Sequence, residues 1–519
     1  MKQTAKPGKY LKKSQPSRWS GVLTAVPAVL MAVASLCFFA ALWYTGTYGD
    51  TGFDSIVYTL FSDLGGTQSG LILDFCLKAL LPAVLMSIGM TALMVLLPRL
   101  VSACPRWLSR SLVLVLSLVM LTHAAVSTGL PEYVYGMFNK GSLFEEYYVT
   151  PGEENITFPE EKRNLIYIFL ESMETTYLSE DLGGAQEENL IPELTQLAQE
   201  NLCFSHNDDV GGFLPVSGTT WTIGAMVAHT SGVPLKTPAD VEDWQNGYGE
   251  EGEFLPGIVS LQDVLADAGY YQTLMVGSVA SFGGRSVYYK THGSDHIYDL
   301  STARRDGIIP SDYFVWWGME DKYLFEYAKQ ELTEISQRSE PFAFTMLTVD
   351  THHIGGYVCE YCGTDHEEQY ENVISCSDKQ VLEFVEWIQA QPFYENTTII
   401  ITGDHLSMDK DYFERNVDDS YVRRDYNCFI NAAVDTQFSK NRQFSALDMF
   451  PTTLAALGCE IRGERLGLGV NLFSGEPTLI EKLGYGEFDR QLSMDSEYYA
   501  VHFRLEEPEM LPGVSETAQ

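Results

Sequence analysis

The sequence predicts an α/β protein in two parts: an N-terminal helical transmembrane anchor, then a larger domain with a mostly parallel central sheet. Two observations lead to this prediction. The first quarter of the chain holds three long apolar stretches, and the remainder alternates short β-branched or aromatic runs with longer helix-like stretches. At 519 residues the chain exceeds one ordinary domain, so an anchor and one large globular domain are the natural division.

Three apolar stretches are long enough to cross a bilayer. They cover residues 22–44, 70–97 and 108–126, and each approaches or exceeds the roughly 20 residues that a hydrocarbon core requires. The first could instead be a secretory signal peptide, but its apolar part is too long and two further stretches follow it. Asp74 and Lys78 stand four residues apart at the start of the second stretch, where they could pair or lie at the interface.

The distribution of positive charge predicts the orientation. Lys and Arg residues precede the first stretch and separate the second from the third, whereas the loop between the first two carries Asp50 and Asp63. The positive-inside rule therefore predicts a cytoplasmic N-terminus and an extracytoplasmic remainder. We expect residues 1–129 to form the basic N-terminus and three transmembrane helices, 130–162 a linker, and 163–519 the extracytoplasmic domain.

The chain is strongly acidic, with a formal net charge of −37 at pH 7. This charge argues against nucleic acid as a partner, because nucleic-acid phosphates require a basic surface. It also disfavours broad contact with anionic headgroups, so any lipid should be held locally in a pocket. The alternative is that most of the charge simply keeps an exported domain soluble.

The predicted domain contains a cluster of closely spaced cysteines, Cys359, Cys362 and Cys376, out of nine cysteines in the chain. In an oxidising compartment such spacing suggests a disulfide within the cluster, whose pairing the sequence does not decide. Alternatively, Cys359 and Cys362 could join His366 in a zinc site, although a full set of ligands is not apparent.

Strands and helices are predicted to alternate through the domain. The predicted strands are Asn164–Leu170, Tyr271–Val276, 342–349 and 398–402. The predicted helices are 189–200, 261–268, 321–338, 377–391 and 446–457.

Ligands of open α/β sheets bind beyond the carboxyl ends of the strands. Glu171, Asp350–His353 and Asp404–His405 all lie there.

Two of these strand ends carry residues that could bind a metal. Asp404 and His405 follow a buried strand and Gly403, which allows a turn, and one carboxylate with one imidazole suits Mn²⁺, Zn²⁺ or Mg²⁺. Glu171 follows another apolar run, where an unpaired charge would be costly. The alternatives are a turn aspartate beside a surface histidine, and a carboxylate favoured by a helix dipole.

A hydroxyl cluster, Ser217-Gly-Thr-Thr-Trp-Thr222, precedes a short helix-like stretch. A hydroxyl at a helix N-terminus lies where backbone N–H groups attract phosphate, and a nearby divalent cation favours loss of its proton. One threonine is therefore a candidate nucleophile, or else only a helix N-cap. His352 and His353 follow a further strand, and we expect one of them to contact a phosphate oxygen or assist a leaving alkoxide.

Together these segments resemble the lipoteichoic acid synthase and phosphoglycerol transferase family of the sulfatase/alkaline phosphatase superfamily. The resemblance covers residues 164–472 and is closest to the phosphoglycerol transferases that decorate glucans. It rests on Gly218-Thr-Thr-Trp-Thr-Ile223, Ser231-Gly-Val-Pro-Leu235, Phe282-Gly-Gly-Arg285, Thr291-His-Gly293, Asp350-Thr-His-His353, Cys359-x-x-Cys362, Gly403-Asp-His405, Leu447-Asp-Met-Phe-Pro-Thr452 and Gly467-Leu-Gly-Val-Asn-Leu472. It implies a sulfatase-like catalytic domain.

The resemblance also implies roles for individual residues. The metal ligands would be Glu171, Thr220, Asp404 and His405. The nucleophile would be Thr220, with the adjacent Thr219 as a rival. The substrate contacts would be His352 and Arg285, although this chain has Ser278-Val279 where relatives tend to have an aspartate before the arginine. Three apolar stretches rather than five also favour the glucan-decorating branch.

The implied activity is metal-dependent transfer of sn-glycerol 1-phosphate from phosphatidylglycerol to a glycan or polyglycerol phosphate acceptor through a phosphoglycerol-threonine intermediate. The implied cofactor is one divalent metal, Mn²⁺ before Mg²⁺ or Zn²⁺. The alternatives are a phosphoethanolamine transferase, or a phosphodiesterase or sulfatase, of the same superfamily; a sulfatase Cys-x-Pro-x-Arg segment is absent from the sequence. From a different class, the chain could be an inactive membrane sensor or scaffold.

Overall fold

The computed structural model describes residues 18–49, 52–61, 69–101, 104–237, 252–294 and 296–505. The chain divides into two compact units. A helical unit comprises Met1–Thr45 and Ser69–Thr128, and an α/β unit comprises Gly46–Gln68 and Gly129–Gln519. The basic N-terminal residues behind the predicted orientation lie outside the described residues.

The helical unit consists of long apolar helices. They are α1 (Arg18–Tyr48), α3 (Ser69–Phe75), η1 (Cys76–Leu80), α4 (Leu81–Leu100) and α5 (Arg106–Ser127), the last three residues of α1 belonging to the α/β unit. Three stretches, Thr24–Tyr48, Gly70–Leu100 and Arg106–Ser127, are long and apolar enough to cross a membrane. They coincide with the three predicted stretches, and they indicate a membrane protein.

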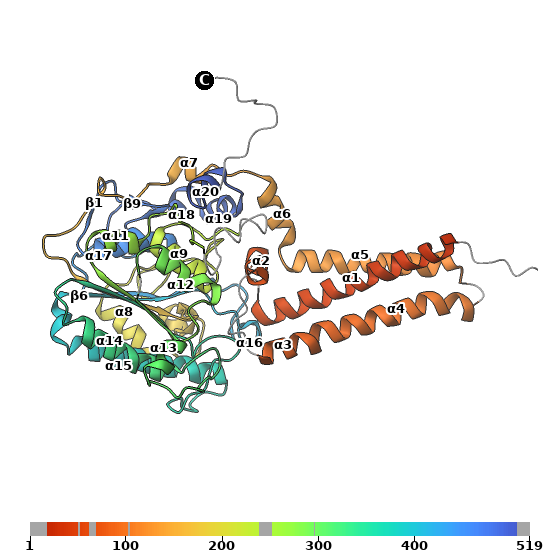
Figure 1. Cartoon of the computed structure of the whole chain (residues 1–519), viewed down its shortest axis with the longest axis horizontal. Coiled ribbons are helices and arrows are strands. Elements are labelled where there is room, and N and C mark those ends of the chain that lie inside the picture. The colour runs from red at the N-terminus through yellow and green to blue at the C-terminus, as the bar shows by residue number, and fades with distance from the viewer. Residues whose placement is uncertain are drawn as a thin grey trace, which may run out of the picture. The chain divides into compact units, whose positions relative to one another are not determined.

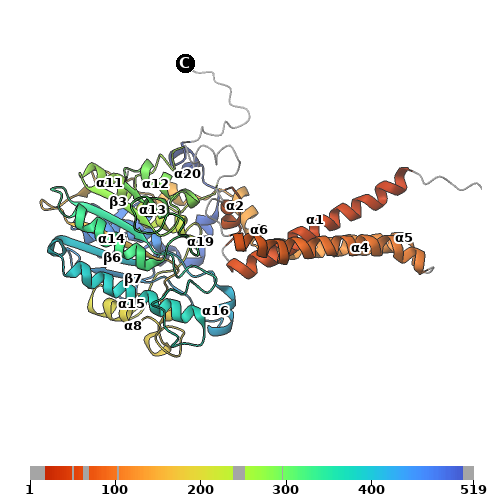
Figure 2. The same cartoon turned by 60° about the horizontal axis from the view of Figure 1, so that its bottom comes forward.

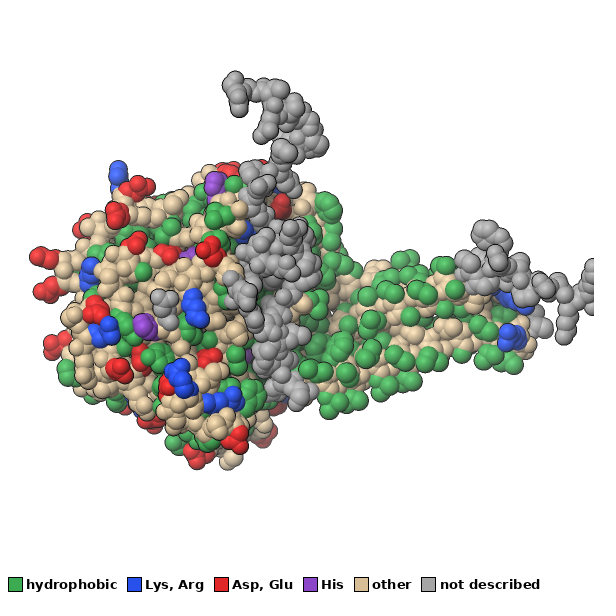
Figure 3. Space-filling model, in the orientation of Figure 1, with side chains coloured by type: hydrophobic (Ala, Val, Ile, Leu, Met, Phe, Trp, Pro, Cys, Tyr) green, Lys and Arg blue, Asp and Glu red, His purple; other side chains and the backbone are tan. Residues whose placement is uncertain are grey.

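The surface of the helical unit is that of a bundle in lipid. Large aliphatic side chains such as Leu85 and Val115 face outward, and hydrophobic side chains cover its surface in Figure 3. Small or flexible side chains such as Ala34 and Met94 are buried between the helices, where they allow close packing. The Asp74 carboxylate lies 3.0 Å from Lys78 Nζ and accepts a hydrogen bond from the Trp43 indole, so the expected pair forms.

The α/β unit is built on a six-stranded sheet with strand order β4-β3-β5-β2-β6-β7. The strands are β2 (Asn164–Leu170), β3 (Tyr271–Val276), β4 (His296–Tyr298), β5 (Phe342–Leu347), β6 (Thr397–Gly403) and β7 (Asn427–Ile430). All neighbours pair in parallel except β6 and β7, which are antiparallel. The predicted fold class and all four predicted strands are confirmed.

Two helical layers bury the two faces of the sheet (Figures 1 and 2). Alternate residues of β2 enter different cores: Tyr167 and Phe169 pack in one, Ile166 and Ile168 in the other. In a strand that is buried on both faces, residues pointing to either side are apolar. This explains why the strands appear in the sequence as continuous apolar runs. The first core also contains residues of α9 (Thr222–Ser231), α11 (Leu261–Asp267), α12 (Arg285–Thr291) and α17 (Met449–Ala456). The second contains residues of α8 (Pro192–Glu200), α13 (Leu300–Arg305), α14 (Asp321–Ile335), α15 (Gln369–Gln389) and α16 (Lys410–Asn416).

Shorter elements complete the α/β unit. The two-stranded sheets pair β1 (Ile156–Thr157) with β8 (Glu460–Ile461) and β9 (Arg465–Leu466) with β10 (Gly469–Val470). The remaining α-helices are α2 (Phe53–Phe61), α6 (Leu130–Phe138), α7 (Leu143–Tyr147), α18 (Leu479–Leu483), α19 (Tyr485–Ser493) and α20 (Glu497–His502). The short 3₁₀ turns are η2 (Thr175–Tyr177), η3 (Glu180–Leu182), η4 (Phe282–Gly284), η5 (Pro392–Asn396) and η6 (Ala446–Asp448).

The predicted helices all exist, and α11 and α14 begin at the predicted residues, whereas the start of α15 differs because tertiary packing overrides local preference. Helix α15 begins at Gln369 rather than at the predicted 377. Its extra turns bury Tyr370, Val373 and Ile374, whose three- and four-residue spacing forms one apolar face. This packing outweighs the weak helix preference of the serines and cysteine that follow.

Gly403, the last residue of β6, is a sensitive position. A Cβ at Gly403 would lie 1.9 Å from the backbone oxygen of Met173, so an alanine there requires the backbone to move. We predict that Gly403→Ala lowers the Tm of the detergent-solubilised chain by several degrees, consistent with the roughly 1–3 kcal/mol or more that overpacking costs. Thermal unfolding followed by circular dichroism measures this shift.

The matched control is Gly486→Ala in helix α19, where a Cβ would meet no atom within 4 Å. Alanine is the better helix former by up to about 1 kcal/mol, so the Tm should stay or rise slightly. Equal Tm values for the wild type and Gly403→Ala would contradict the close approach at β6.

Candidate functional site

Two neighbouring parallel strands bring the candidate metal ligands together. In the pairing of β2 with β6, Leu170 lies opposite Gly403, so the residues that follow each strand leave the sheet side by side. These residues are Glu171 from β2, and Asp404 and His405 from β6. All three are buried, and one ligand atom from each lies within 4.8 Å of the others.

Backbone and side-chain hydrogen bonds fix the two carboxylates. The Ser172 N–H donates to Asp404 Oδ1 at 2.8 Å, and the Ser172 hydroxyl donates to Glu171 Oε1 at 2.8 Å. Ser172 can reach both because its backbone is left-handed, with φ of 57°, a conformation that is uncommon for a residue other than glycine. One residue therefore sets the positions of both acids.

The imidazole of His405 is oriented by its own loop. Its Nδ1 lies 2.9 Å from the carbonyl oxygen of Leu406. A carbonyl oxygen only accepts, so Nδ1 carries a proton and Nε2 is the nitrogen that faces the cluster. That Nε2 lies 3.6 Å from Glu171 Oε1 and 3.4 Å from Asp404 Oδ2. The Nε2 edge of the ring is thus beside the two carboxylates.

The electrostatics of this cluster favour a cation. Burial and the neighbouring charge of Glu171 raise the pKa of Asp404 to about 7. Burial alone would lower the pKa of His405, but the charges of Asp404 and Glu171 outweigh it and raise that pKa. Asp404 Oδ2 is buried and, among the described residues, makes no hydrogen bond. Two carboxylates and an imidazole suit a divalent metal, so the residues present fit one.

The threonines of the hydroxyl cluster occupy different environments. Thr222 Oγ1 lies 3.3 Å from His405 Nε2. The Thr219 hydroxyl instead donates to the carbonyl oxygen of Val216 at 2.8 Å and accepts the Val216 N–H, so it closes a turn. Thr220 is partly buried, and it is not one of the described residues that line the cavity beside the cluster. The Thr222 hydroxyl therefore lies beside His405, whereas the Thr219 hydroxyl is engaged in a turn.

Helix α9 explains why Thr222 has this position. The preceding Trp221 has an extended backbone, and Thr222 is the first helical residue, so its hydroxyl is at the end of a helix whose first N–H groups lack intrahelical partners. The turn before the helix needs Gly218, which has φ of 83° and whose Cβ would be 2.8 Å from Pro234 Cβ. Residues Ile223–Ser231 of the helix are buried, which fixes its end.

Arg285 comes from the loop after β3 and is buried. Its Nη2 donates to Ser278 Oγ at 2.9 Å and to the Val279 carbonyl at 2.8 Å, and its Nε donates to the Phe282 carbonyl. Burial lowers the pKa of Arg285 to about 10, and the charge of Glu171 partly opposes this, so the guanidinium stays protonated at neutral pH. The Ser278-Val279 segment thus supplies neutral acceptors for the arginine.

His352 comes from the loop after β5. Its Nδ1 lies 2.8 Å from the His353 carbonyl, so Nδ1 carries the proton. Burial lowers the pKa of His352 to about 4, and its ring is neutral at neutral pH. The two adjacent histidine rings stack with their centroids 4.4 Å apart, and Trp317 packs on His352 at 4.6 Å. Of the two histidines, only His352 is among the described residues that line the cavity.

The loops after four neighbouring strands enclose one small cavity. Its volume is about 30 Å³, enough for one or two water molecules. Its polar and aromatic lining includes Glu171, Thr222, Ser278, Arg285, Trp317 and His352. The lining therefore includes three of the predicted site residues, Glu171, Arg285 and His352, and Asp404 and His405 adjoin Glu171.

Among the lining residues to which sequence reasoning assigned no individual role are Thr222, Ser278 and Trp317. Thr222 had a usable signal, because it directly precedes the apolar helical run and so marks the helix start. Ser278 lies where relatives tend to have an aspartate, and its hydroxyl oxygen accepts a hydrogen bond from Arg285. Trp317 carried no signal, because it lies in a loop whose path depends on the fold.

Buried carboxylates outside the cluster hold the loops in place. Glu174 is fully buried, accepts the Ser407 N–H at 3.0 Å, and forms an ion pair with Arg423, which ties down the segment after His405. Asp350 accepts the Asp321 N–H at 3.1 Å, and the Asp321 carboxylate accepts the Asp350 N–H in return. The predicted Asp350 thus fixes the start of the loop that carries His352.

Helix α2 contacts two segments of this site through Tyr58. The Tyr58 hydroxyl donates to the Gly283 carbonyl at 2.6 Å, two residues before Arg285. The Tyr58 ring packs on Trp221, with centroids 5.7 Å apart. The residues that precede Arg285 and Thr222 are therefore joined through one side chain.

Comparison with known proteins places this geometry in a family. Residues 163–459 match the sequence pattern of the Sulfatase family. The chain is 29% identical over 413 residues to phosphoglycerol transferase I of Salmonella paratyphi B, which covers 77% of this chain and 50% of that protein. Phosphoglycerol transferase I of Salmonella typhimurium matches to the same extent. The chain thus spans about half the length of the curated relatives it matches.

A similar fold occurs in solved structures. The integral membrane protein lipooligosaccharide phosphoethanolamine transferase A from Neisseria meningitidis aligns over 84% of this chain and 86% of its own, with 12% identity and a TM-score of 0.50. At that identity the likeness concerns the fold alone. The family match covers more than half of the chain, and the resemblance to phosphoglycerol transferases is confirmed by the curated relatives. The chain belongs to the sulfatase family.

Proposed function

We propose that this chain is a membrane-anchored transferase that moves sn-glycerol 1-phosphate from phosphatidylglycerol to a hydroxyl of a glycan or a polyglycerol phosphate. The observation that carries the proposal is the approach of the Thr222 hydroxyl to His405 beside two buried carboxylates. The similarity to curated phosphoglycerol transferases over 77% of the chain supports the choice of transferred group. We do not expect nucleic acid to bind, because the chain carries a net charge of −37.

The proposed cofactor is one divalent metal, Mn²⁺ before Mg²⁺ or Zn²⁺, held by Glu171, Asp404, His405 and a threonine hydroxyl. The bound cation supplies positive charge that favours loss of the threonine proton and stabilises the phosphoryl oxygens. The hydroxyl ligand and nucleophile predicted from the sequence is Thr220. The 3.3 Å separation of Thr222 Oγ1 from His405 Nε2 favours Thr222 for both roles instead.

The proposed reaction has two displacements at phosphorus. The Thr222 oxygen attacks the phosphorus of phosphatidylglycerol, a threonine–phosphorus bond forms, and the bond to the diacylglycerol oxygen breaks. Diacylglycerol leaves with a proton and stays in the membrane. An acceptor hydroxyl then attacks the same phosphorus, loses its proton, and restores the threonine.

Two cavity side chains have proposed roles in both displacements. Arg285 stays protonated and offers N–H groups and charge to the phosphoryl oxygens. His352 is neutral with its proton on Nδ1, so its Nε2 is available as the acceptor of the proton that the attacking hydroxyl loses. The small cavity beside them would exclude most water, which limits hydrolysis of the intermediate.

Several features suit a donor that remains in the membrane. Three apolar helices anchor the chain, and α2, which follows α1 in sequence, contacts the segments that carry Thr222 and Arg285 through Tyr58. The orientation proposed from the positive-inside rule places the α/β unit outside the cytoplasm. The acceptor is then an extracytoplasmic glycan or polymer.

The donor is tested with the detergent-solubilised full chain, Mn²⁺ and phosphatidylglycerol labelled in its glycerol headgroup. We predict diacylglycerol release and transient label on the protein, with phosphatidylethanolamine as the matched control donor. Preferential consumption of phosphatidylethanolamine would instead indicate the phosphoethanolamine transferase alternative. Consumption of neither lipid, with cleavage of a soluble phosphodiester or sulfate ester, would contradict lipid headgroup transfer.

The nucleophile is tested by two neighbouring substitutions. We predict that Thr222→Ala reduces diacylglycerol release at least about a thousandfold, as expected when a nucleophile is lost, while Thr220→Ala retains most activity. Peptide mapping should locate the phosphoglycerol adduct on Thr222. Loss of release in Thr220→Ala, with the adduct mapped to Thr220, would contradict the assignment to Thr222.

The metal site is tested through Ser172, which touches both carboxylates without being a proposed ligand. Ser172→Ala removes the hydrogen bond to Glu171 Oε1. We predict that it raises the Mn²⁺ concentration needed for half-maximal activity roughly 10–100-fold, as outer hydrogen-bond partners of metal ligands do. Ser179→Ala, at a buried serine in a different turn, should leave this concentration unchanged. Activity that persists in excess chelator would contradict a metal-dependent reaction.

A further inference from the structure

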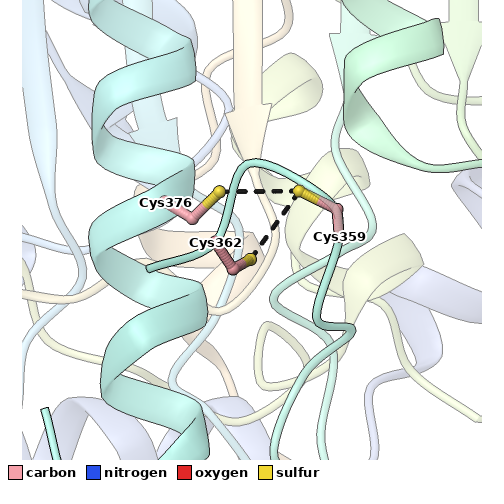
Figure 4. Close-up of side chains that lie close together, drawn as sticks. All are labelled: Cys359, Cys362 and Cys376. Atoms are coloured by element: carbon pink, nitrogen blue, oxygen red, sulfur yellow. Dashed lines mark hydrogen bonds between the residues drawn. The ribbon is translucent and has the colours of Figure 1, made fainter. Parts of the chain in front are cut away.

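The loop after β5 brings three cysteine sulfurs together a few residues beyond His352. Cys359 and Cys362 lie on this loop, and Cys376 lies on helix α15 (Figure 4). Cys359 Sγ is 3.6 Å from Cys376 Sγ and 3.7 Å from Cys362 Sγ. The three sulfurs are not bonded to one another, so the predicted disulfide is not formed in this structure. They define a compact group at the junction of the loop and the helix.

The separations of the sulfurs match thiolates around one metal ion. A zinc ion holds thiolates at about 2.3 Å, so two sulfurs at neighbouring corners of a tetrahedron are about 3.8 Å apart. A disulfide would require about 2.05 Å. Both measured separations from Cys359 are close to the tetrahedral value, and the third pair of sulfurs lies within 4.8 Å. The three side chains converge on a common point.

The surroundings of the sulfurs favour thiolates. The Tyr361 N–H donates to Cys359 Sγ at 3.4 Å, and the Gln380 side-chain amide donates to Cys376 Sγ at 3.4 Å. Such N–H donors offset the negative charge of metal-bound sulfur. Cys359 and Cys376 are each only 5% exposed.

We propose that Cys359, Cys362 and Cys376 bind one Zn²⁺-type cation as thiolates, at a site separate from the acids of the catalytic cluster. Thiolates select soft d¹⁰ ions, and binding releases the three thiol protons. His366, the partner considered from the sequence, is not in this group: its Nε2 lies 3.2 Å from the Ser375 hydroxyl. Among the described residues the protein would thus supply three ligands, with a fourth position open to solvent.

Such a site would clamp the loop that carries His352 to the scaffold. Cys359 and Cys362 belong to the loop, whereas Cys376 lies in the second turn of a long, well-buried helix. A shared ion therefore restrains the loop against α15 near the cavity. This role does not depend on which phosphodiester the cavity binds, so it can fail or hold independently of the proposed transferase activity.

The test titrates Co²⁺ into the reduced, metal-free full chain in detergent. Cobalt bound to thiolates shows sulfur-to-metal charge-transfer absorption, whereas Glu171, Asp404 and His405 offer only oxygen and nitrogen. We expect this absorption to saturate at one equivalent and to disappear when Zn²⁺ displaces the cobalt. Zn²⁺ should also protect the three cysteines from iodoacetamide, read by peptide mass. Absence of the absorption in the reduced wild type would overturn the proposal.

Substitutions locate the ligands. Cys362→Ser and Cys376→Ser should each lose the charge-transfer absorption and weaken Zn²⁺ binding at least about a hundredfold. Cys459→Ser, at a buried cysteine outside the group, is the matched control and should retain both. Unchanged absorption in both cluster variants would overturn the assignment. So would a disulfide-linked peptide containing Cys359 in protein isolated without reductant.

Discussion

The close approach of two buried carboxylates is the constraint on which the site depends. The register of β2 and β6 places Leu170 opposite Gly403, so Glu171 and Asp404 leave the sheet as neighbours in a nearly dry interior. Two like charges at low dielectric destabilise each other, and this repulsion contributes to the raised pKa of Asp404. A divalent cation at this place would relieve the repulsion and would give Asp404 Oδ2, which makes no hydrogen bond among the described residues, a partner.

The neighbouring loops balance the charge of this cluster with different groups. Arg285 contributes a buried positive charge whose position is fixed by three acceptors from its own loop. His352 contributes a neutral ring, because burial removes its tendency to protonate. A cavity with one fixed cation, one neutral base and one hydroxyl on a helix end suits a group that is negatively charged and changes bonding partners, as a phosphoryl group does.

The supporting interactions lie mostly at the starts of the site loops. The Glu174–Arg423 pair holds the segment after His405, and the reciprocal bonds of Asp321 and Asp350 hold the start of the β5 loop. The cysteine group lies further along the same β5 loop, where the loop meets α15, and the proposed ion would restrain it there. Geometry within an ångström matters for catalysis, so restraints on both ends of a loop have a direct consequence for the cavity.

The amino-acid sequence was enough to predict the apolar helices, the fully buried strands and the acids at their ends. Length and apolarity suffice for the helices. Parallel strands gather their carboxyl ends at one edge, so Glu171, Asp404 and His405 could be grouped from their positions after two apolar runs. The start of α15 at Gln369 could not be predicted, because it depends on the packing of side chains against other elements.

The environments of the clustered threonines could be described only in the folded chain. Thr219, Thr220 and Thr222 lie within four residues, and sequence spacing alone did not distinguish them. In the fold, Thr222 is the first residue of the buried helix α9, while Thr219 closes the preceding turn. The partners of Arg285 and the convergence of three cysteines depend on the fold in the same way. Chain order determines which residues come after each strand, but only packing determines which side chains meet across loops.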